Sequence, residues 1–281
     1  MSPATDEFVV AWTSYLVTPE QVTEEATMPA RETAIVGAPC WADLMTSDTQ
    51  RSRDFYGAVL GWTAEEPQEE HGGYFNFRKS DVRVAGCMAS QPGVDVTDVW
   101  SVYLASDNAQ KTLDIAEREG GQIHVPAMPV DELGVMAFLA DPGGAGIGVW
   151  QPGTHQGFGL VDEPGTPSWF ELHTRDYEKV LAFYRNVFGW DTQVESDTAE
   201  FRYTTLQYGD QPLAGVMDAT AFLASDAPSC WSVYWAVADA DESAKRIVDN
   251  GGSLVHPPHD SPYGRLVEVR DPHGAAFKLR A

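Results

Sequence analysis

The chain contains two copies of one sequence pattern, and this duplication constrains the fold more than any other feature. Each copy has a tryptophan-containing segment, a Phe-Tyr pair, a Gly-Trp pair and a closing Asp-Pro-x-Gly turn, in the same order. Elements of matching type in matching order indicate two domains with one fold. The matching segments are Cys40–Leu44 and Ser168–Leu172, Phe55-Tyr56 and Phe183-Tyr184, Gly61-Trp62 and Gly189-Trp190, Trp100–Tyr103 and Trp231–Tyr234, and Asp141–Gly144 and Asp271–Gly274.

Charge and cysteine content exclude several classes of protein. The 281 residues carry a formal net charge of -24, which repels nucleic acid and anionic membranes, so we expect neither as a partner. Three cysteines without a CxxC spacing argue against a disulfide framework and a zinc cluster. No segment approaches the roughly 18 apolar residues that cross a bilayer, and the acidic start lacks the basic region of a secretory signal. We therefore expect a cytoplasmic protein.

The repeats also predict the domain boundaries. Residues 1–37 have no counterpart in the second copy and form an N-terminal extension, whereas the Gly/Pro-rich residues 154–165 read as a linker. The domains are then 38–153 and 166–281. A weaker repeat inside each copy predicts two β-α-β-β-β units per domain, and therefore an α+β fold. In the first unit, Asp48 is the expected N-cap of a helix that Gly61 ends.

This order of elements resembles the vicinal oxygen chelate superfamily, which contains glyoxalases, bleomycin-resistance proteins and extradiol dioxygenases. The resemblance extends from about residue 38 to the end of the chain. It implies two tandem glyoxalase-like domains, in each of which the two units form an open barrel around a cleft. It also implies where metal-dependent members hold a divalent ion with His and Glu: on the first strand of each unit and on the strand after Asp-Pro-x-Gly.

The residues at those positions cannot bind a metal in the ordinary way. An indole nitrogen only donates its proton, glycine has no side chain and lysine is a cation, whereas divalent ions need carboxylate oxygen or neutral imidazole. We therefore expect no metal and no cofactor, although a metal site at other positions, such as Glu171 with His173, stays open. The six positions are Trp41, Trp169, Trp100, Trp231, Gly148 and Lys278. The two on the first strands of the second units, Trp100 and Trp231, are placed to within one residue.

Strand alternation predicts what fills the clefts instead, because residues two apart share a face. Large apolar walls with a few convergent polar groups are typical of a small-molecule site, and indole rings favour a flat aromatic ligand or a cation. The predicted ligand-binding residues are Trp41, Asp43 and Trp100 in the first cleft, with Met45 beside them, and Trp169, Trp231 and Trp235 in the second, next to Glu171, His173 and Lys278.

The residues leave both structural and functional interpretations open. The tryptophans could simply fill closed cores, and Glu171, His173 and Lys278 could satisfy one another. We predict a metal-independent protein, monomer or homodimer, that binds a small aromatic or hydrophobic molecule, as drug-sequestering resistance proteins of this superfamily do. The alternative is a secondary-metabolism tailoring enzyme (isomerase, cyclase, lyase or hydroxylase-like) with Glu171 as base, His173 as proton shuttle and Lys278 as oxyanion stabiliser.

We expect the segment His256–His259 to be a loop, because its two prolines exclude a helix.

Overall fold

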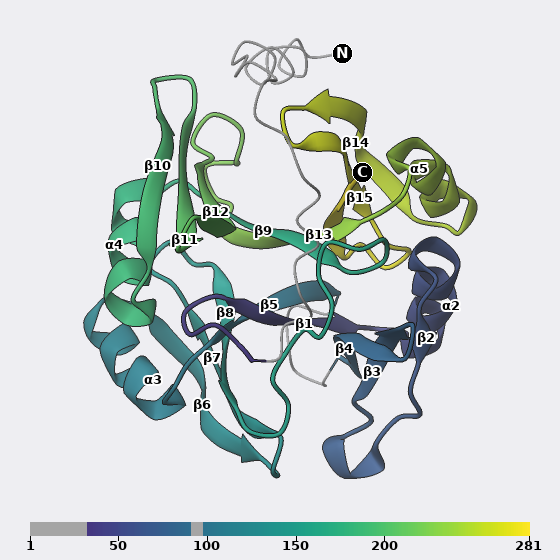
Figure 1. Ribbon diagram of the computed structural model, residues 1–281, viewed down its shortest axis with the longest axis horizontal. Coiled ribbons are helices and arrows are strands. Elements are labelled where there is room, and N and C mark those ends of the chain that lie inside the picture. The colour runs from purple at the N-terminus through teal and green to yellow at the C-terminus, as the bar shows by residue number, and fades with distance from the viewer. Residues whose placement is uncertain (1–32, 91–97) are drawn as a thin grey trace.

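A computed structural model describes residues 33–90 and 98–281, and residues 1–32 of the predicted N-terminal extension lie outside the described residues. The described chain forms two eight-stranded sheets, one from each copy of the repeat (Figure 1). The first sheet has the order β2-β3-β4-β1-β5-β8-β7-β6. Its strands are β1 (Pro39–Thr46), β2 (Thr63–Ala64), β3 (Phe75–Lys79), β4 (Val82–Ala89), β5 (Val99–Ala105), β6 (Gln122–Val130), β7 (Gly134–Ala140) and β8 (Gly146–Pro152).

The second sheet repeats this topology in the order β10-β11-β12-β9-β13-β16-β15-β14. In both sheets the first strands of the two units pair antiparallel at the centre, and each pairs in parallel with the last strand of its own unit. The predicted α+β fold with two β-α-β-β-β units per domain is therefore confirmed. The strands are β9 (Pro167–Thr174), β10 (Asp191–Asp197), β11 (Arg202–Tyr208), β12 (Gln211–Asp218), β13 (Cys230–Ala236), β14 (Ser253–Ser261), β15 (Gly264–Arg270) and β16 (Ala276–Arg280).

One helix follows the first strand of each unit: α2 (Thr49–Leu60), α3 (Ala109–Arg118), α4 (Tyr177–Phe188) and α5 (Ala240–Asp249). A short 3-10 helix, η1 (Glu69–His71), lies between β2 and β3. The Asp48 carboxylate accepts a hydrogen bond from the Arg51 N–H, and Gly61 ends α2 with a φ of 69°. Both predicted caps are confirmed, and a positive φ explains why glycine stands at that end.

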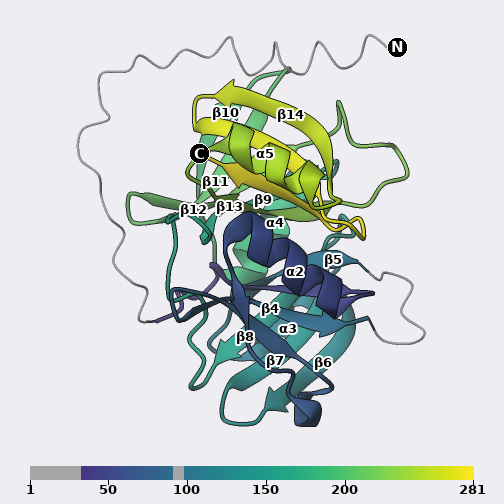
Figure 2. The same ribbon diagram turned by 90° about the vertical axis from the view of Figure 1, so that its right-hand side faces the viewer.

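The two domains pack against each other through the repeated motifs. Helix α2 of the first domain lies beside α5 of the second, and α3 lies beside α4 (Figures 1 and 2). The Tyr56 hydroxyl donates to Asp271 across the interface at 3.1 Å, and the Tyr184 hydroxyl donates to Asp141 at the same distance. The Phe-Tyr pair of each copy thus meets the Asp-Pro-x-Gly turn of the other copy. The shared motifs maintain the domain assembly.

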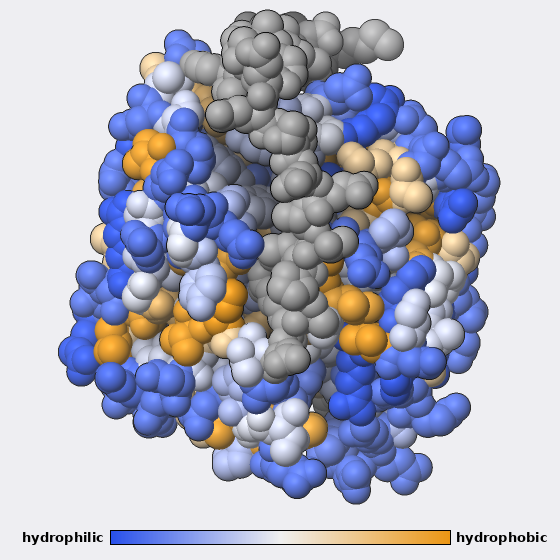
Figure 3. Space-filling view, viewed as in Figure 1, coloured by the Kyte–Doolittle hydropathy of each residue, from blue (hydrophilic) through white to orange (hydrophobic). Residues whose placement is uncertain are grey.

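The loop prediction for His256–His259 is wrong, because these residues lie in β14. This strand is at the edge of its sheet. Proline is tolerated at an edge, because an N–H on the open side of the strand would have no partner strand to bond to. No helix in residues 33–90 and 98–281 is long and apolar enough to cross a membrane. The face of the molecule in Figure 3 is mostly hydrophilic with scattered apolar patches, in keeping with the acidic composition.

Candidate functional site

The concave face of the first sheet holds a cavity of about 750 Å³. Aromatic rings from three strands and from the segment before β3 form much of its wall, and methionine side chains add flexible apolar surface. Such a wall accommodates flat, apolar molecules of different outline. The aromatic lining residues are Trp41, Tyr74, Tyr103, Trp150 and His155, and the methionines are Met88, Met128 and Met136.

The charged side chains that line this cavity are mostly acidic. Glu70, Asp131 and Glu132 come from η1 and from the turn between β6 and β7, and Arg83 is the only Lys or Arg among the described lining residues. His71 Nε2 lies 2.8 Å from Asp131 Oδ2, so η1 and the β6–β7 turn meet beside the cavity. These elements belong to opposite edges of the sheet, and the contact brings those edges together around the cavity.

Asp43 is the carboxyl group that β1 places in this cavity. Its Oδ1 accepts hydrogen bonds from Trp41 Nε1 and from the Tyr74 hydroxyl, both at 2.9 Å. The Tyr103 hydroxyl on β5 lies close enough to this carboxyl group to lower its pKa. The predicted pair Trp41 and Asp43 is therefore brought together, whereas the two tyrosines were not identified from the sequence.

The electrostatic environment of Asp43 favours its neutral form. Burial raises the pKa of Asp43 from 3.8 to about 6, and the hydrogen bonds from Tyr74 and Trp41, together with the nearby Tyr103 hydroxyl, offset only part of this effect. Burial and the nearby carboxylate also raise the pKa values of Tyr74 and Tyr103 well above 10, so both phenols keep their protons. Asp43 can thus gain or lose a proton close to neutral pH.

The second domain carries the same arrangement around Glu171, with two added groups. The Tyr203 hydroxyl donates to Glu171 Oε1 at 2.9 Å and the Tyr234 hydroxyl to Oε2 at 2.7 Å. His173 Nε2 lies 2.6 Å from Glu171 Oε2, and Lys278 Nζ donates to the same oxygen at 3.2 Å. The structure therefore brings the predicted residues Glu171, His173 and Lys278 together, and they bond to one another.

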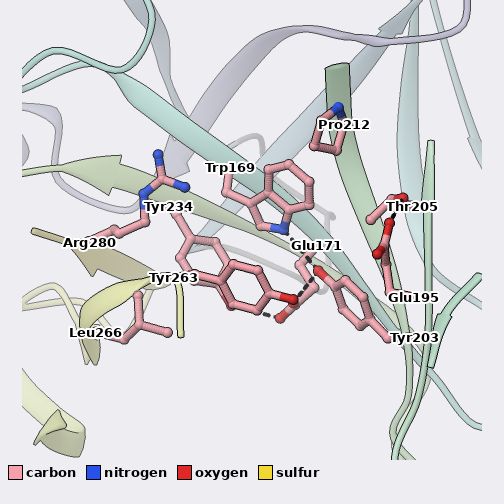
Figure 4. A pocket seen from close by; sticks show the side chains of 10 residues that line it. All are labelled: Trp169, Glu171, Glu195, Tyr203, Thr205, Pro212, Tyr234, Tyr263, Leu266 and Arg280. Carbon is pink, nitrogen blue, oxygen red and sulfur yellow. Dashed lines mark hydrogen bonds between the residues drawn. The ribbon is translucent and has the colours of Figure 1, made fainter. Parts of the chain in front are cut away.

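These contacts keep Glu171 ionised. Burial alone would raise its pKa, but the charge of Lys278 and the contact with His173 hold the pKa well below its usual range. The Glu171 side chain is only 3% exposed. It lies at a cavity of about 230 Å³, which Trp169 and Tyr263 also line (Figure 4).

Register explains why only one copy has a cation here. Tyr103 on β5 pairs with Gly148 on β8, and Tyr234 on β13 pairs with Lys278 on β16. A Cβ at Gly148 would lie 2.1 Å from the Tyr103 ring, so the ring occupies the space that a side chain would need. Because the first domain has glycine at this position, Asp43 has no lysine beside it, whereas Glu171 in the second domain is paired with Lys278.

Glycines on the neighbouring strands make room for both carboxyl groups. Gly86 on β4 pairs with Asp43, and Gly215 on β12 pairs with Glu171. A Cβ at Gly86 would lie 1.9 Å from the Tyr74 hydroxyl, and one at Gly215 would lie 1.9 Å from the Tyr203 hydroxyl. Sequence reasoning missed these glycines and the tyrosines, although each pair recurs at the repeat offset.

Three predicted ligand-binding tryptophans do not line either of the two cavities, and their predicted placement is wrong. Trp100 pairs with Leu44 and Trp231 with Leu172, so both face away from the carboxyl groups. A register error of one residue moves a side chain to the opposite face of a sheet. Trp100 Nε1 instead donates to Tyr56 at 3.0 Å, Trp231 Nε1 donates to Tyr184 at 2.9 Å, and Trp235 packs between Trp62 and Trp100.

No group of three or more His, Cys, Asp or Glu side chains that could hold a metal ion occurs in the described part of the chain. Metal-dependent members of the vicinal oxygen chelate superfamily have metal ligands on the first strands. At these positions β1 and β9 of this chain carry Trp41 and Trp169. Both indole nitrogens donate hydrogen bonds, to Asp43 and Tyr203 respectively. The residues at these positions do not fit a divalent ion.

Comparison with known proteins identifies the family. The sequence model of the glyoxalase/bleomycin resistance protein/dioxygenase superfamily matches twice, at residues 39–149 and 166–279. The chain belongs to this superfamily. Two relatives in the superfamily align over nearly their whole length. They are CFP32 of Mycobacterium tuberculosis (33% identity; 90% of this chain and 97% of CFP32) and the anthracycline biosynthesis protein DnrV of Streptomyces peucetius (34% identity; 86% of this chain and 92% of DnrV).

Solved structures of the superfamily share the fold. The Mn(II)-bound glyoxalase of Novosphingobium aromaticivorans aligns with a TM-score of 0.61 at 15% identity, over 87% of this chain and 81% of that one. The 2,3-dioxygenase LapB of Pseudomonas sp. KL28 also has a TM-score of 0.61, at 14% identity, over 88% of this chain and 93% of that one. At identities this low, the comparison shows the shared fold alone.

Proposed function

We propose that the protein is a metal-independent member of its superfamily that binds a flat aromatic molecule in the cavity of the first domain. The observation that carries this proposal is the cavity of about 750 Å³, which has aromatic and methionine walls and a single strand-borne carboxyl group, Asp43, with tyrosine neighbours. Binding sites for small molecules typically measure about 300–1,000 Å³ and combine apolar walls with a few polar groups.

The second cavity supports this role less well. Its volume of about 230 Å³ lies below the usual range for ligand sites. The polar groups there are also occupied, because Glu171 receives four hydrogen-bond donors from within the domain. We therefore assign ligand binding to Trp41 and Asp43 in the first domain, and a structural role to the second network.

The relatives favour an aromatic ligand. DnrV is named as an anthracycline biosynthesis protein, and anthracyclines contain a flat system of fused rings. Rings of this shape stack on indole and phenol faces such as those of Trp41 and Tyr103. We accordingly place the protein in secondary metabolism, with a fused-ring aromatic compound as its ligand.

Isothermal titration calorimetry with 1,8-dihydroxyanthraquinone tests the proposal. We expect one-to-one saturable binding. At about 0.3 kcal/mol per heavy atom, a ligand of this size binds with a Kd on the order of 100 µM or lower. Met136→Trp, which places a bulky indole in the first cavity, should weaken binding. Its matched control is Leu266→Trp, which alters the second cavity at the equivalent position of β15 and should leave the affinity unchanged.

Two results would overturn the proposal. The absence of saturable binding to the full chain would remove the ligand, and loss of binding only in Leu266→Trp would move the site to the second domain. Elemental analysis gives an independent check, since a stoichiometric divalent metal in the purified protein would contradict metal independence.

A tailoring enzyme that uses Glu171, His173 and Lys278 is a second candidate function. The mutual contacts of these three residues, with Lys278 Nζ 3.3 Å from His173 Nε2, are the observation that favours it. A general base needs an accessible lone pair near its substrate. The four donors around Glu171 occupy most of its lone pairs, which weakens this candidate. Retention of turnover in Glu171→Gln would exclude this candidate.

A further inference from the structure

We propose that Asp43 is the acid–base residue of the first cavity and that its substrate is an aromatic ketone whose keto and enol forms the protein interconverts. The inference rests on the proposed function, because it needs an aromatic ligand in that cavity. It adds a reaction, a substrate class and the residue that transfers the proton.

The two buried carboxyl groups differ in the hydrogen-bond acceptor positions that they have left. A carboxylate has about four lone-pair positions. Glu171 receives four donors, three at Oε2 (His173, Lys278 and Tyr234) and one at Oε1 (Tyr203), and its side chain is only 3% exposed, so little of its acceptor capacity is left for a substrate proton.

Asp43 receives two donors, Trp41 Nε1 and the Tyr74 hydroxyl, both at Oδ1. An acceptor position therefore remains at a carboxyl group that lines the cavity and is not fully buried. This position is where the proton of a bound ligand can go.

The groups around Asp43 are neutral or distant from its charge. Its carboxyl group is faced by the neutral phenols of Tyr74 and Tyr103 and by Trp41, and Cys87 on β4 lies near enough for the Asp43 charge to raise the pKa of the thiol.

Arg83 and His155 also line the cavity, but neither contributes to the pKa of Asp43. Burial lowers the pKa of His155 to about 4, so this ring is neutral near pH 7. With no charged partner in this set, Asp43 can change protonation state during a reaction at moderate cost.

The reaction balances without a co-reactant. Asp43 removes a proton from a carbon conjugated with the carbonyl group, either directly next to it or across the ring as in anthrone, and the electron pair of the broken C–H bond forms a C=C bond of the enolate. The π electrons of the C=O bond move to oxygen, and the proton held by Asp43 then passes to that oxygen. One hydrogen moves from carbon to oxygen, and nothing is oxidised or reduced.

A hydrogen–deuterium exchange experiment with anthrone as the probe tests the inference on the full chain. Anthrone is a three-ring ketone whose CH₂ hydrogens exchange with solvent through its enol. Exchange in D₂O under nitrogen is followed by proton NMR between pH 5 and 8, beside a binding isotherm for anthrone. We expect protein-dependent exchange that rises with pH through about 6 and then levels off, because the ionised carboxylate is the base.

Variants assign the effect to Asp43. Asp43→Asn should bind anthrone and lose about 100-fold or more of the exchange rate. Tyr74→Phe removes a hydrogen bond that lowers the pKa of Asp43, so the midpoint of the pH profile should move upward. Tyr203→Phe, the same change in the second domain, should leave the profile unchanged. A merely structural role for Tyr74 would not shift a midpoint.

The outcomes separate this inference from the proposed function. Binding of anthrone without protein-dependent exchange, or exchange that Asp43→Asn retains, would overturn the acid–base role while the binding function stands. The absence of anthrone binding would overturn both. A profile that shifts in Tyr203→Phe and not in Tyr74→Phe would also overturn the inference, because the base would then lie in the second domain.

Discussion

The same acid-to-amide substitution should have opposite effects on stability in the two domains. At pH 8, wild-type protein must ionise Asp43 in a site that favours the neutral form. Folding raises the pKa of this group from 3.8 to about 6. The corresponding penalty is about 3 kcal/mol at pH values above 6. Asp43→Asn removes this penalty and should stabilise the folded state at pH 8.

The pH dependence follows from the sign of the shift. The folded protein binds more protons than the unfolded chain between pH 3.8 and about 6, so stability falls as the pH rises through this window. The advantage of Asp43→Asn over wild type should therefore be small at pH 4, grow up to about pH 6 and stay constant above it. A gain of about 3 kcal/mol raises the thermal midpoint by roughly 5–10 °C in a chain of this size.

Glu171→Gln is the matched comparison in the second domain. It leaves Lys278 without its buried counter-charge, which should cost about 3–5 kcal/mol. The pKa of Glu171 is depressed by folding, so its contribution is complete above about pH 4.5 and is lost only as the pH falls below that value.

Thermal unfolding followed by circular dichroism at pH 4, 5, 6, 7 and 8 measures both substitutions. A destabilising effect of Asp43→Asn that does not change with pH would refute the electrostatic reasoning. So would a stabilising effect of Glu171→Gln at pH 7.

Three further substitutions test separate parts of the structure. Tyr56→Phe removes the hydroxyl that donates to Asp271 across the domain interface and should cost about 1–3 kcal/mol in urea unfolding; an unchanged midpoint would contradict an interface role. Lys278→Met should raise the pKa of Glu171, visible as a higher acid-unfolding midpoint than in wild type; an unaltered acid transition would contradict the pairing. Gly86→Ala places a Cβ where the Tyr74 hydroxyl lies and should cost about 1–3 kcal/mol and weaken anthraquinone binding; wild-type values for both would show that the network is not as tight as described.

Much of the architecture could be predicted because duplication provided an internal control. The Phe-Tyr pairs, the Asp-Pro-x-Gly turns and the caps of α2 each appear in order, and local rules for helices and turns apply to them directly. Strand alternation placed Trp41 and Asp43 on one face correctly because both lie on a single strand, β1.

The placement of Trp100 and Trp231 could not be predicted with the same certainty. Their orientation depends on the register between two strands from different units, and a shift of one residue reverses the face. The hydrogen bonds from these indoles to Tyr56 and Tyr184 join residues far apart in sequence. Pairing across such separations is a property of the folded sheet.

The difference between the two carboxyl groups was also beyond sequence reasoning. The presence of Glu171, His173 and Lys278 predicted more chemistry in the second domain, but the structure shows that these residues bond to one another. The first domain has glycine in place of the lysine, and this leaves Asp43 without a cation. Burial and unpaired charge decide which group can titrate, and neither is visible in a list of residue types.

The most direct test of this account is a carbon-13 NMR titration of the Asp and Glu side-chain carboxyl groups, with Asp43 identified by the signal that disappears in Asp43→Asn. The account predicts a midpoint of about 6 for Asp43, and a Glu171 signal that stays in its ionised form throughout the range in which the protein is folded. A midpoint for Asp43 below 4, as in an exposed aspartate, would contradict the claim that the first domain holds the protonatable carboxyl group.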